Sequence, residues 1–444
     1  MEYIKAFLSL GTYIILPIMM FVLAVFMRAK LTEAFRGALY IGIALLGISM
    51  ISSYFLSNAA PVIEGINAAL NKKSAITDVG WPVIAMLAWN METTLLIVPI
   101  HILVNLIMLK IGLTSNINVD IFNFWHLATA SLFIKCFTDS IIPVIIADVL
   151  MSVIFIKLTD WANPSVKALY DIDETQCIST ANGLCYMPFA VAINWLIDKI
   201  PFMKKVSFKP ERIDKKYRLF IDPGFIALIV GTVFSLVAGL GFWGSVTFGM
   251  KLAAVFVILP LVTGLLREGF TPVSQATAKF AQKYITKGRP VYVGVNQLIT
   301  GNNPSLIITT IILIPIIVIF AAVIPSVGIF PMGDLMNIIS IVTVIVAVSK
   351  GDVIRSVISS IPVVILNLFC ATYAAQFYTQ AAAAMNYDMG GVTGSFAASL
   401  NGNMYVSLWI SEAFKGNILA ISLTAVIAAG GWLCYRFYKK QQEK

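Results

Sequence analysis

The stretch Asn118-Val-Asp-Ile-Phe-Asn-Phe-Trp-His126 places three polar side chains, Asp120, Asn123 and His126, in a strongly apolar chain. Because residues three apart share one side of a helix, these side chains would form a single polar row. Ionisable groups between apolar segments are costly and usually mark ligand or ion sites. The stretch therefore predicts a functional site, and the apolar segments around it predict the membrane scaffold that holds it.

The composition of the whole chain agrees with a membrane scaffold. Of its 444 residues, 59% are hydrophobic and 12% are charged, which excludes a soluble domain. Apolar runs that can cross a hydrocarbon layer of about 30 Å recur from end to end, so we expect an all-α polytopic protein with about 10–12 transmembrane helices. Runs such as 306–324 are continuously apolar, unlike the alternating strands of a β-barrel.

The charged residues predict an orientation. The net charge of +9 comes from basic residues at span ends and in the segment 204–218, a pattern that favours lipid orientation over nucleic-acid binding. We expect this segment and the C-terminal tail to be cytoplasmic, and the N-terminus to lie outside. The first apolar segment, 7–27, follows no small-residue cleavage pattern and is expected to be retained. The cysteines lack CxxC or Cys/His spacing, which predicts neither a disulfide framework nor a metal site.

An internal repeat is the most informative pattern in the chain. Asp120-Ile-Phe-Asn123 recurs as Asp334-Leu-Met-Asn337, about 214 residues later. Two homologous halves with odd numbers of crossings would form inverted structural repeats, as in many transporters. Further markers keep the same order: Pro61 with Pro272, Val79-Gly80 with Val293-Gly294, Asn90 with Asn303, Pro99 with Pro315, and Lys135 and Asp139 with Lys350 and Asp352.

The repeat also predicts where the regular helices break. Asp78-Val-Gly-Trp-Pro82 cannot continue a helix, and 61–70 is expected to form a separate short amphipathic helix. The broken or re-entrant segments 78–90 and 292–304 would meet near the midplane of the bilayer. The expected divisions are a first repeat at 1–200, a basic cytoplasmic connector at 201–220, a second repeat at 221–400, and a C-terminal helix and tail at 401–444.

Polar residues in and beside these breaks are the candidate site residues. Amide side chains suit an uncharged hydroxylated ligand because they both donate and accept hydrogen bonds. Other interpretations stay open: Asp120 and Asp334 also suit N-caps of broken helices, and Trp81 also suits simple packing. His101 is interpreted as a buried packing residue. The candidates are Asp78, Trp81, Asp120, Asn123, His126, Thr180, Asn182, Asn296, Asn302 and Asp334.

Three motifs together resemble a known family. Asp78-Val-Gly-Trp-Pro82, the stretch from Asn118 to His126, and Phe330-Pro-Met-Gly-Asp334 resemble the galactitol-type membrane component (IIC) of the bacterial phosphoenolpyruvate-dependent phosphotransferase system, and the resemblance covers nearly the whole chain. It implies similarity in fold to the ascorbate-type permeases. Each protomer of a homodimer would then hold scaffold helices, about 1–77 and 221–290, and a core, about 78–200 and 291–400, that moves like an elevator.

The resemblance also implies group translocation across the bacterial inner membrane. A linear polyol would enter from outside and bind the candidate residues. A separate IIB protein would then donate a phosphoryl group from its phosphocysteine, having received it from phosphoenolpyruvate through a separate IIA protein. The resemblance implies no bound cofactor, and the chain holds no phosphoacceptor motif of its own. Asp120 or His126 would be the possible general base.

Two departures from the family pattern leave the polyol open. Asn296 stands where galactitol-type relatives carry an aspartate, and Ser179-Thr-Ala-Asn-Gly183 stands where they carry Pro-His-Gly-Thr. Galactitol and another polyol, such as a pentitol, are both consistent with the sequence. The alternative function is a proton- or Na⁺-coupled secondary sugar transporter, in which Asp120 and Asp334 would carry the ion. A channel is a third possibility.

Overall fold

The structure is a computed structural model that describes residues 12–69, 76–203, 206–211, 219, 222–296, 300–301, 303–387, 392 and 394–424. Half of the basic connector, the C-terminal tail from residue 425 and the candidate Asn302 therefore lie outside the described residues.

The described chain is mostly helical. Five of its helices, α3, α7, α11 with its π-helical end η2, α12 and α14, are long and apolar enough to cross a membrane. This confirms a multi-pass membrane protein. The first half holds α2 (Thr12–Phe26), α3 (Leu31–Ala69), α4 (Gly80–Trp89), α5 (Thr94–Lys110), α6 (Ile121–Lys135), α7 (Ile141–Leu169), α8 (Ala181–Leu184) and α9 (Met187–Ile197). The second half holds α10 (Pro223–Val237), α11 (Gly241–Phe280), η2 (Ala281–Ile285), α12 (Pro304–Val323), η4 (Leu335–Asn337), α13 (Ile338–Val348), α14 (Val353–Ala384) and α15 (Tyr405–Phe414).

Four helices, α2, α3, α10 and α11, pack into one bundle. The crossing of α3 and α11 depends on two glycines, because a Cβ on Gly37 would lie 2.6 Å from the carbonyl oxygen of Gly269. Small residues let membrane helices approach closely in this way. The expected separate helix at 61–70 is wrong, since α3 continues through Pro61. Buried contacts of Val62 and Ile63 in the bundle hold the helix together past the proline.

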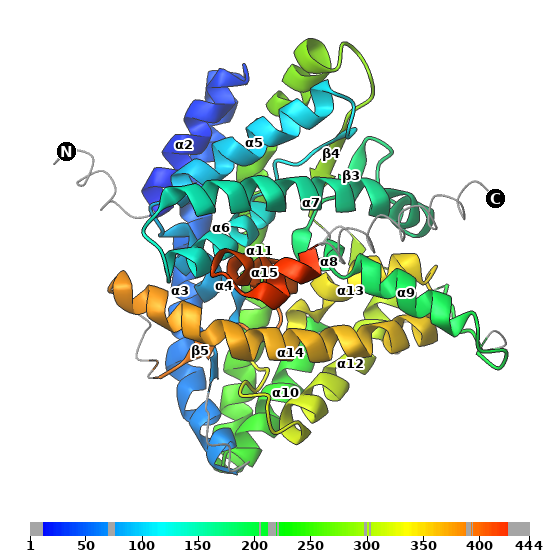
Figure 1. Ribbon diagram of the computed structural model, residues 1–444. Helices are drawn as coiled ribbons and strands as arrows, with labels where there is room; N and C mark the ends of the chain where they lie inside the picture. Colours follow the sequence, from blue (N-terminus) through cyan, green and yellow to red (C-terminus); the bar gives the residue numbers. More distant parts are fainter. Residues whose placement is uncertain are drawn as a thin grey trace.

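The remaining helices form a second group that holds most of the polar residues. Within it α5, α6 and α7 pack together, as do α12, α13 and α14. Figure 1 shows α7 and α14 crossing the view with the short α15 between them, and α15 contacts both. Contacts of α13 with α7 and α8 join the two halves.

Very short parallel strands interrupt the helices and interleave the halves. They are β1 (Thr77–Asp78), β2 (Asn116–Ile117), β3 (Gln176–Ile178), β4 (Tyr292–Val295) and β5 (Phe396–Ala397). In one sheet, β4 of the second half lies between β2 and β3 of the first half. In the other, the chain at β1 pairs with β5 and, through a bridge from Ile76, with Ile329 of the second half.

The strands also set the positions of the polar residues. All of these pairings are parallel, so the carboxyl ends of the strands in each sheet lie at one edge. At that edge of the first sheet, β2, β3 and β4 are followed by Asn118, Ser179 and Asn296. Residues that are far apart in the sequence are thereby brought to one place.

Candidate functional site

Asp120 lies at the carboxyl edge of the β2-β4-β3 sheet and caps α6. Its Oδ1 accepts a hydrogen bond from the Phe122 N–H at 3.1 Å, which confirms the capping interpretation for this residue. The side chain of Asn296 lies against the same carboxylate. Even so, Oδ2 is buried and receives no hydrogen bond of normal geometry from the described part of the chain. One oxygen of Asp120 thus holds the helix, and the other is left for a ligand or water.

Asn123 joins α6 to the turn that follows β3. Its Nδ2 donates to Asn118 Oδ1 at 2.8 Å and to the Ser179 carbonyl at 2.5 Å, and its Oδ1 accepts from the Ala181 N–H at 2.7 Å. Both amide atoms are therefore engaged by the protein. This geometry gives Asn123 a positioning role in the turn that carries Thr180, the N-cap residue of α8.

Asn182 is in the opposite situation. Its side chain is fully buried in α8, yet neither Oδ1 nor Nδ2 has a hydrogen-bond partner among the described residues. The next residue, Gly183, lies so close to α13 that a Cβ there would be 2.6 Å from the Ser340 carbonyl oxygen. An unpaired buried amide costs about 1–3 kcal/mol. The Asn182 amide is therefore the clearest group in this region that awaits a hydrogen-bonding ligand.

At the second sheet, the buried carboxylate of Asp78 ties three chain segments together. Its Oδ2 accepts from the N–H groups of Met332, Gly333 and Asp334 at 2.8, 3.0 and 3.2 Å. Its Oδ1 accepts from the N–H groups of Gly80 and Ser399, both at 3.1 Å. Because five main-chain N–H groups donate to it, this carboxylate has a structural role in holding these segments together.

Asp334 completes the same junction from the second half. Its Oδ2 accepts from the N–H groups of Leu400 at 3.1 Å and Asn401 at 2.6 Å. Its Oδ1 accepts from the Trp81 N–H at 3.3 Å and from the side-chain amide of Asn337. Within the described chain, Asp334 makes no capping bond to η4, so the capping interpretation is wrong here. The carboxylate instead binds the turn after β5.

His126 connects the two junctions. Its Nδ1 bonds the Phe122 carbonyl one turn earlier in α6, and its Nε2 lies 2.7 Å from Oδ1 of Asn401. The ring stacks on Trp125 with centroids 3.9 Å apart, and Trp125 in turn stacks on Trp81 at 6.1 Å. A neutral imidazole that donates from Nδ1 accepts at Nε2, which requires the NH₂ group of the Asn401 amide to face the ring.

Sequence reasoning missed Asn401. The signal was present, because Asn401-Gly402 after β5 repeats Asn182-Gly183 after β3. Both glycines allow the turn to approach a neighbouring helix closely. A Cβ on Gly402 would lie 3.0 Å from the ring of Trp125 in α6, and Gly183 lies similarly close to α13.

The candidates therefore fall into two neighbouring groups. Asp120, Asn123, Thr180, Asn182 and Asn296 lie around the first sheet, and Asp78, Trp81 and Asp334 lie at the second, with His126 and Asn401 between them. His101 is fully buried between α5 and α7, with its Nδ1 2.8 Å from Ser152 Oγ and its ring 5.5 Å from that of Phe124 in α6. Its Nε2 has no hydrogen-bond partner among the described residues, and the interpretation of His101 as a packing residue stays a prediction.

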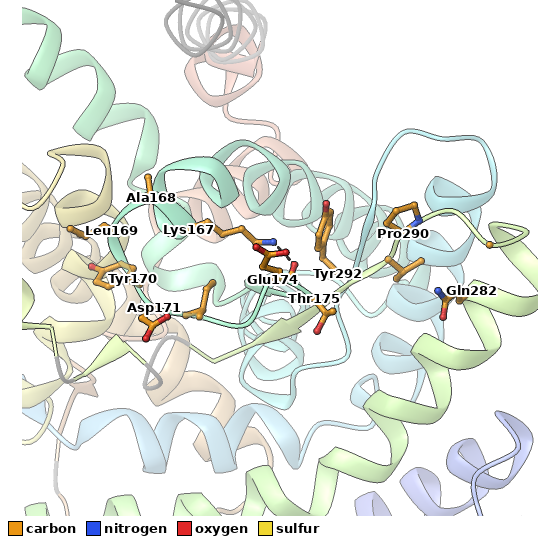
Figure 2. Close-up of a pocket in the computed structure, with 13 residues that line it drawn as sticks. Lys167, Ala168, Leu169, Tyr170, Asp171, Glu174, Thr175, Gln282, Pro290 and Tyr292 are labelled. Carbon is orange, nitrogen blue, oxygen red and sulfur yellow. Dashed lines mark hydrogen bonds between the residues drawn. The ribbon is translucent and has the colours of Figure 1, made fainter.

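A cavity of about 770 Å³ lies at the other end of the first sheet, where β3 and β4 begin (Figure 2). None of the candidate residues lines it. The cavity is therefore separate from the polar groups described above.

Comparisons with known proteins agree on one family. Residues 6–391 match the family model described as "PTS system sugar-specific permease component". The chain is 29% identical over 423 residues to a predicted permease IIC component of Escherichia coli (strain K12), covering 95% of this chain and 96% of that protein. It is 28% identical over 385 residues to the PTS system galactitol-specific EIIC component of Escherichia coli (strain K12), covering 86% of this chain and 84% of that protein, and equally similar to the same component of Escherichia coli O157:H7.

Proposed function

The chain belongs to the family of sugar-specific permease components of the phosphotransferase system, and from this premise we propose that it takes up galactitol or a related polyol across the bacterial inner membrane. A separate IIB protein phosphorylates the polyol at the cytoplasmic face. One observation supports this proposal above the others: the Asn182 amide and Asp120 Oδ2 are buried without hydrogen-bond partners among the described residues.

The chemistry of these groups matches a polyol. Each hydroxyl of a polyol donates one hydrogen bond and accepts others, and an amide does both as well. A carboxylate oxygen such as Asp120 Oδ2 accepts from a hydroxyl. We therefore propose that Asp120, Asn182 and Asn296 contact the polyol directly, with Thr180 beside them. Asn123, Asp78 and Asp334 hold the surrounding turns, Trp81 supports the stacked rings, and Asn302 stays a predicted contact.

The transfer step needs little from this chain beyond a base and correct positioning. The oxygen of a polyol hydroxyl forms the new bond to phosphorus, and the phosphorus–sulfur bond of the IIB phosphocysteine breaks, releasing the thiolate. We propose that Asp120 takes the hydroxyl proton, because both ring nitrogens of His126 already bond protein atoms. The phosphoryl group originates from phosphoenolpyruvate and passes through IIA and IIB. No cofactor of the permease itself is required.

We propose that the two halves are inverted repeats. The order of elements supports this: α2 and α10 each have 15 residues, and the helices that follow them, α3 and α11, have 39 and 40. The strand pattern gives further support. The first half places β1 between β5 and Ile329 of the second half, and the second half places β4 between β2 and β3 of the first half. A two-fold relation accounts for both observations.

An elevator movement follows from the same division. The bundle of α2, α3, α10 and α11 would be the scaffold, and the helices that carry the polar groups would be the moving core. Large apolar side chains are exposed along α2 and α3, among them Val22, Phe26 and Phe35. Such a surface suits lipid and the partner subunit of a homodimer.

The orientation is proposed from basic residues that gather at one face. Arg28 donates to the Tyr284 hydroxyl at 2.6 Å, Arg289 to the Leu109 carbonyl at 2.8 Å, and Lys157 to the Leu113 carbonyl at 2.7 Å. These contacts join the ends of α2, η2 and α5 to one another and to the middle of α7. By the positive-inside rule this face is cytoplasmic, and the C-terminus is proposed to lie on the same side.

Transport in membrane vesicles tests the proposed function. Vesicles that contain the permease should accumulate labelled galactitol or a pentitol only as its phosphate, and only with phosphoenolpyruvate and the soluble partners present. Vesicles without the permease are the control. Accumulation of free polyol driven by a proton or Na⁺ gradient alone would refute the proposal and establish a secondary transporter.

A further inference from the structure

The carboxyl of Asp148 lies within α7, a helix long enough to span the membrane, and the proposed polyol site does not use it. Its side chain is buried, and neither carboxyl oxygen has a hydrogen bond of normal geometry with the described part of the chain. A buried carboxylate is stable only with a cation or several hydrogen-bond donors beside it. The polar groups around Asp148 therefore decide whether it is ionised.

The ionisable side chains around α7 provide one partner for Asp148 within the described chain, His101 of α5. Helices α8 and α13 and strand β2, which also pack against α7, carry no ionisable side chain. The remaining groups on α7 and the elements packed against it are bonded elsewhere (Lys157, Asp160, Lys167, His126, Lys135 and Glu412), exposed at a helix end (Lys110) or a buried thiol (Cys177).

Ser152, one turn later in α7, connects this carboxyl to α5. The serine side chain lies against the carboxyl, and its Oγ is 2.8 Å from Nδ1 of His101. The main chain of Asn118 lies against the same imidazole. Because the Asn118 N–H donates to Asn105 Oδ1 at 2.7 Å, the group that Asn118 offers to the ring is its carbonyl. Asn118 begins the stretch that carries Asp120, so the row of polar groups ends beside the polyol site.

The hydrogen bonds of this row have one consistent order in which every group is neutral. A protonated Asp148 donates to Ser152 Oγ, and the serine hydroxyl donates to Nδ1 of His101. The imidazole proton is then on Nε2, which presents a donor to the Asn118 carbonyl.

An ionised Asp148 reverses this order. The serine hydroxyl donates to the carboxylate, so Nδ1 of His101 has to donate to the serine. A neutral ring then presents a bare Nε2 to the Asn118 carbonyl, and two acceptors face each other. Only an imidazolium would restore a donor there, and it would bury two charges in the membrane core.

We propose that Asp148, Ser152 and His101 form a buried proton-binding site, which holds one proton on the Asp148 carboxyl and positions the main chain of Asn118 beside the polyol site. The ligand is the proton itself. Asp148 and His101 act through Asn118, so they are positioning residues, and His101 has a role beyond packing. The effect on polyol affinity rests on the proposed function, whereas the bound proton does not.

Infrared spectroscopy of the purified permease at neutral pH tests for the proton. A protonated carboxylic acid has a carbonyl stretching band separate from those of a carboxylate. The difference spectrum between the wild type and Asp148→Asn should show the loss of one such band, and Ser152→Ala should shift it because the carboxyl loses its acceptor. Asp160→Asn is the matched control. Asp160 lies in the same helix but pairs with Lys157 at 2.8 Å, so this substitution should remove no carboxylic acid band.

Binding of labelled galactitol or a pentitol to the purified permease tests the connection to the polyol site. Asp148→Leu should raise the Kd about tenfold, because the row loses its first donor. Asp148→Asn should restore the affinity, since its amide donates to Ser152 as the protonated acid does. Thr159→Val is the matched control, because the buried Thr159 hydroxyl donates to the Phe155 carbonyl of its own helix at 2.9 Å. It should bind as the wild type does.

Each contrary result overturns a different statement. A difference spectrum without a carboxylic acid band would overturn the proton site, even with normal polyol binding. A wild-type Kd in Asp148→Leu would overturn the positioning role; should that variant fail to fold, Ser152→Ala carries the same expectation of weaker binding. A wild-type permease that binds no polyol would contradict the proposed function, while the infrared spectra would still decide the proton site.

Discussion

His126 in α6 and Asn401 after β5 form a side-chain contact of 2.7 Å between the two halves of the chain. The Asn401 N–H also donates to Asp334 at 2.6 Å. A single residue of the second half thus orients the histidine of the first half and is itself held by the second-half carboxylate. The imidazole has its orientation fixed before any ligand arrives, which is the condition for a precise contact.

Replacing Asn401 by Ala should lower kcat/KM for polyol phosphorylation about tenfold, because a buried ring nitrogen loses its partner. The measurement is a double-mutant cycle with His126→Ala. If Asn401 acts through the histidine, the double variant should lose no more activity than His126→Ala alone. Fully additive losses would show that Asn401 acts independently.

Asp120→Asn separates the capping role of Asp120 from its role at the substrate. Asparagine caps helices as well as aspartate does, so α6 and the thermal stability of the purified protein should be unchanged. Uptake should fall about 100-fold or more if Asp120 is the general base. Asp120→Ala should lose both uptake and stability. Near-normal uptake by Asp120→Asn would remove this residue from the chemistry.

Asn123 and Asn182 provide a matched pair, because both are fully buried asparagines near the same turn. Asn123→Ala removes three hydrogen bonds and should lower the free energy of unfolding by about 1–3 kcal/mol. Asn182→Ala should leave the Tm unchanged and raise the KM for the polyol about tenfold, since its partner is the ligand. Thermal unfolding in detergent and vesicle kinetics distinguish the two. A reversed result would exchange their roles.

Asp78→Ala should act on folding rather than on affinity. The substitution leaves five buried N–H groups without their acceptor, and each costs about 1–3 kcal/mol. We expect a large loss of folded protein in the membrane, measured by size-exclusion chromatography after extraction. A well-folded variant with only a raised KM would instead make Asp78 a substrate ligand.

The sequence predicted the breaks and the membrane class but not the strand pairing. The motif Asp78-Val-Gly-Trp-Pro82 predicts a helix break because these residues cannot continue a regular helix. The structure agrees, since a new helix, α4, begins at Gly80. A strand of two residues has no periodicity, however, and its partner is chosen by packing between the halves. The helix break expected at Pro61 is wrong for a similar reason. Burial in the four-helix bundle outweighs the local preference of proline for ending a helix.

Within the site, the sequence found the right residue types without their roles. The sequence alone does not distinguish Asn123 from Asn182. Only the positions of Ser179 and Ala181 in the structure show that the Asn123 amide already has its hydrogen-bond partners. The markers that predict the repeat end at Asp352, and Asn401 lies 49 residues beyond them. Asn401-Gly402 follows Asn182-Gly183 by 219 residues, five more than the spacing of Asp120 and Asp334, so the pair falls outside the exact register.

The interleaved strands also have a consequence for biosynthesis. When the first half has left the ribosome, β2 and β3 still lack β4, the strand that lies between them. The chain at β1 likewise lacks its partners, Ile329 and Phe396, until they have been translated. Neither sheet is complete until nearly the whole polypeptide has been translated. The halves therefore cannot mature one after the other, and two separately expressed halves would have to find each other before either became a finished unit.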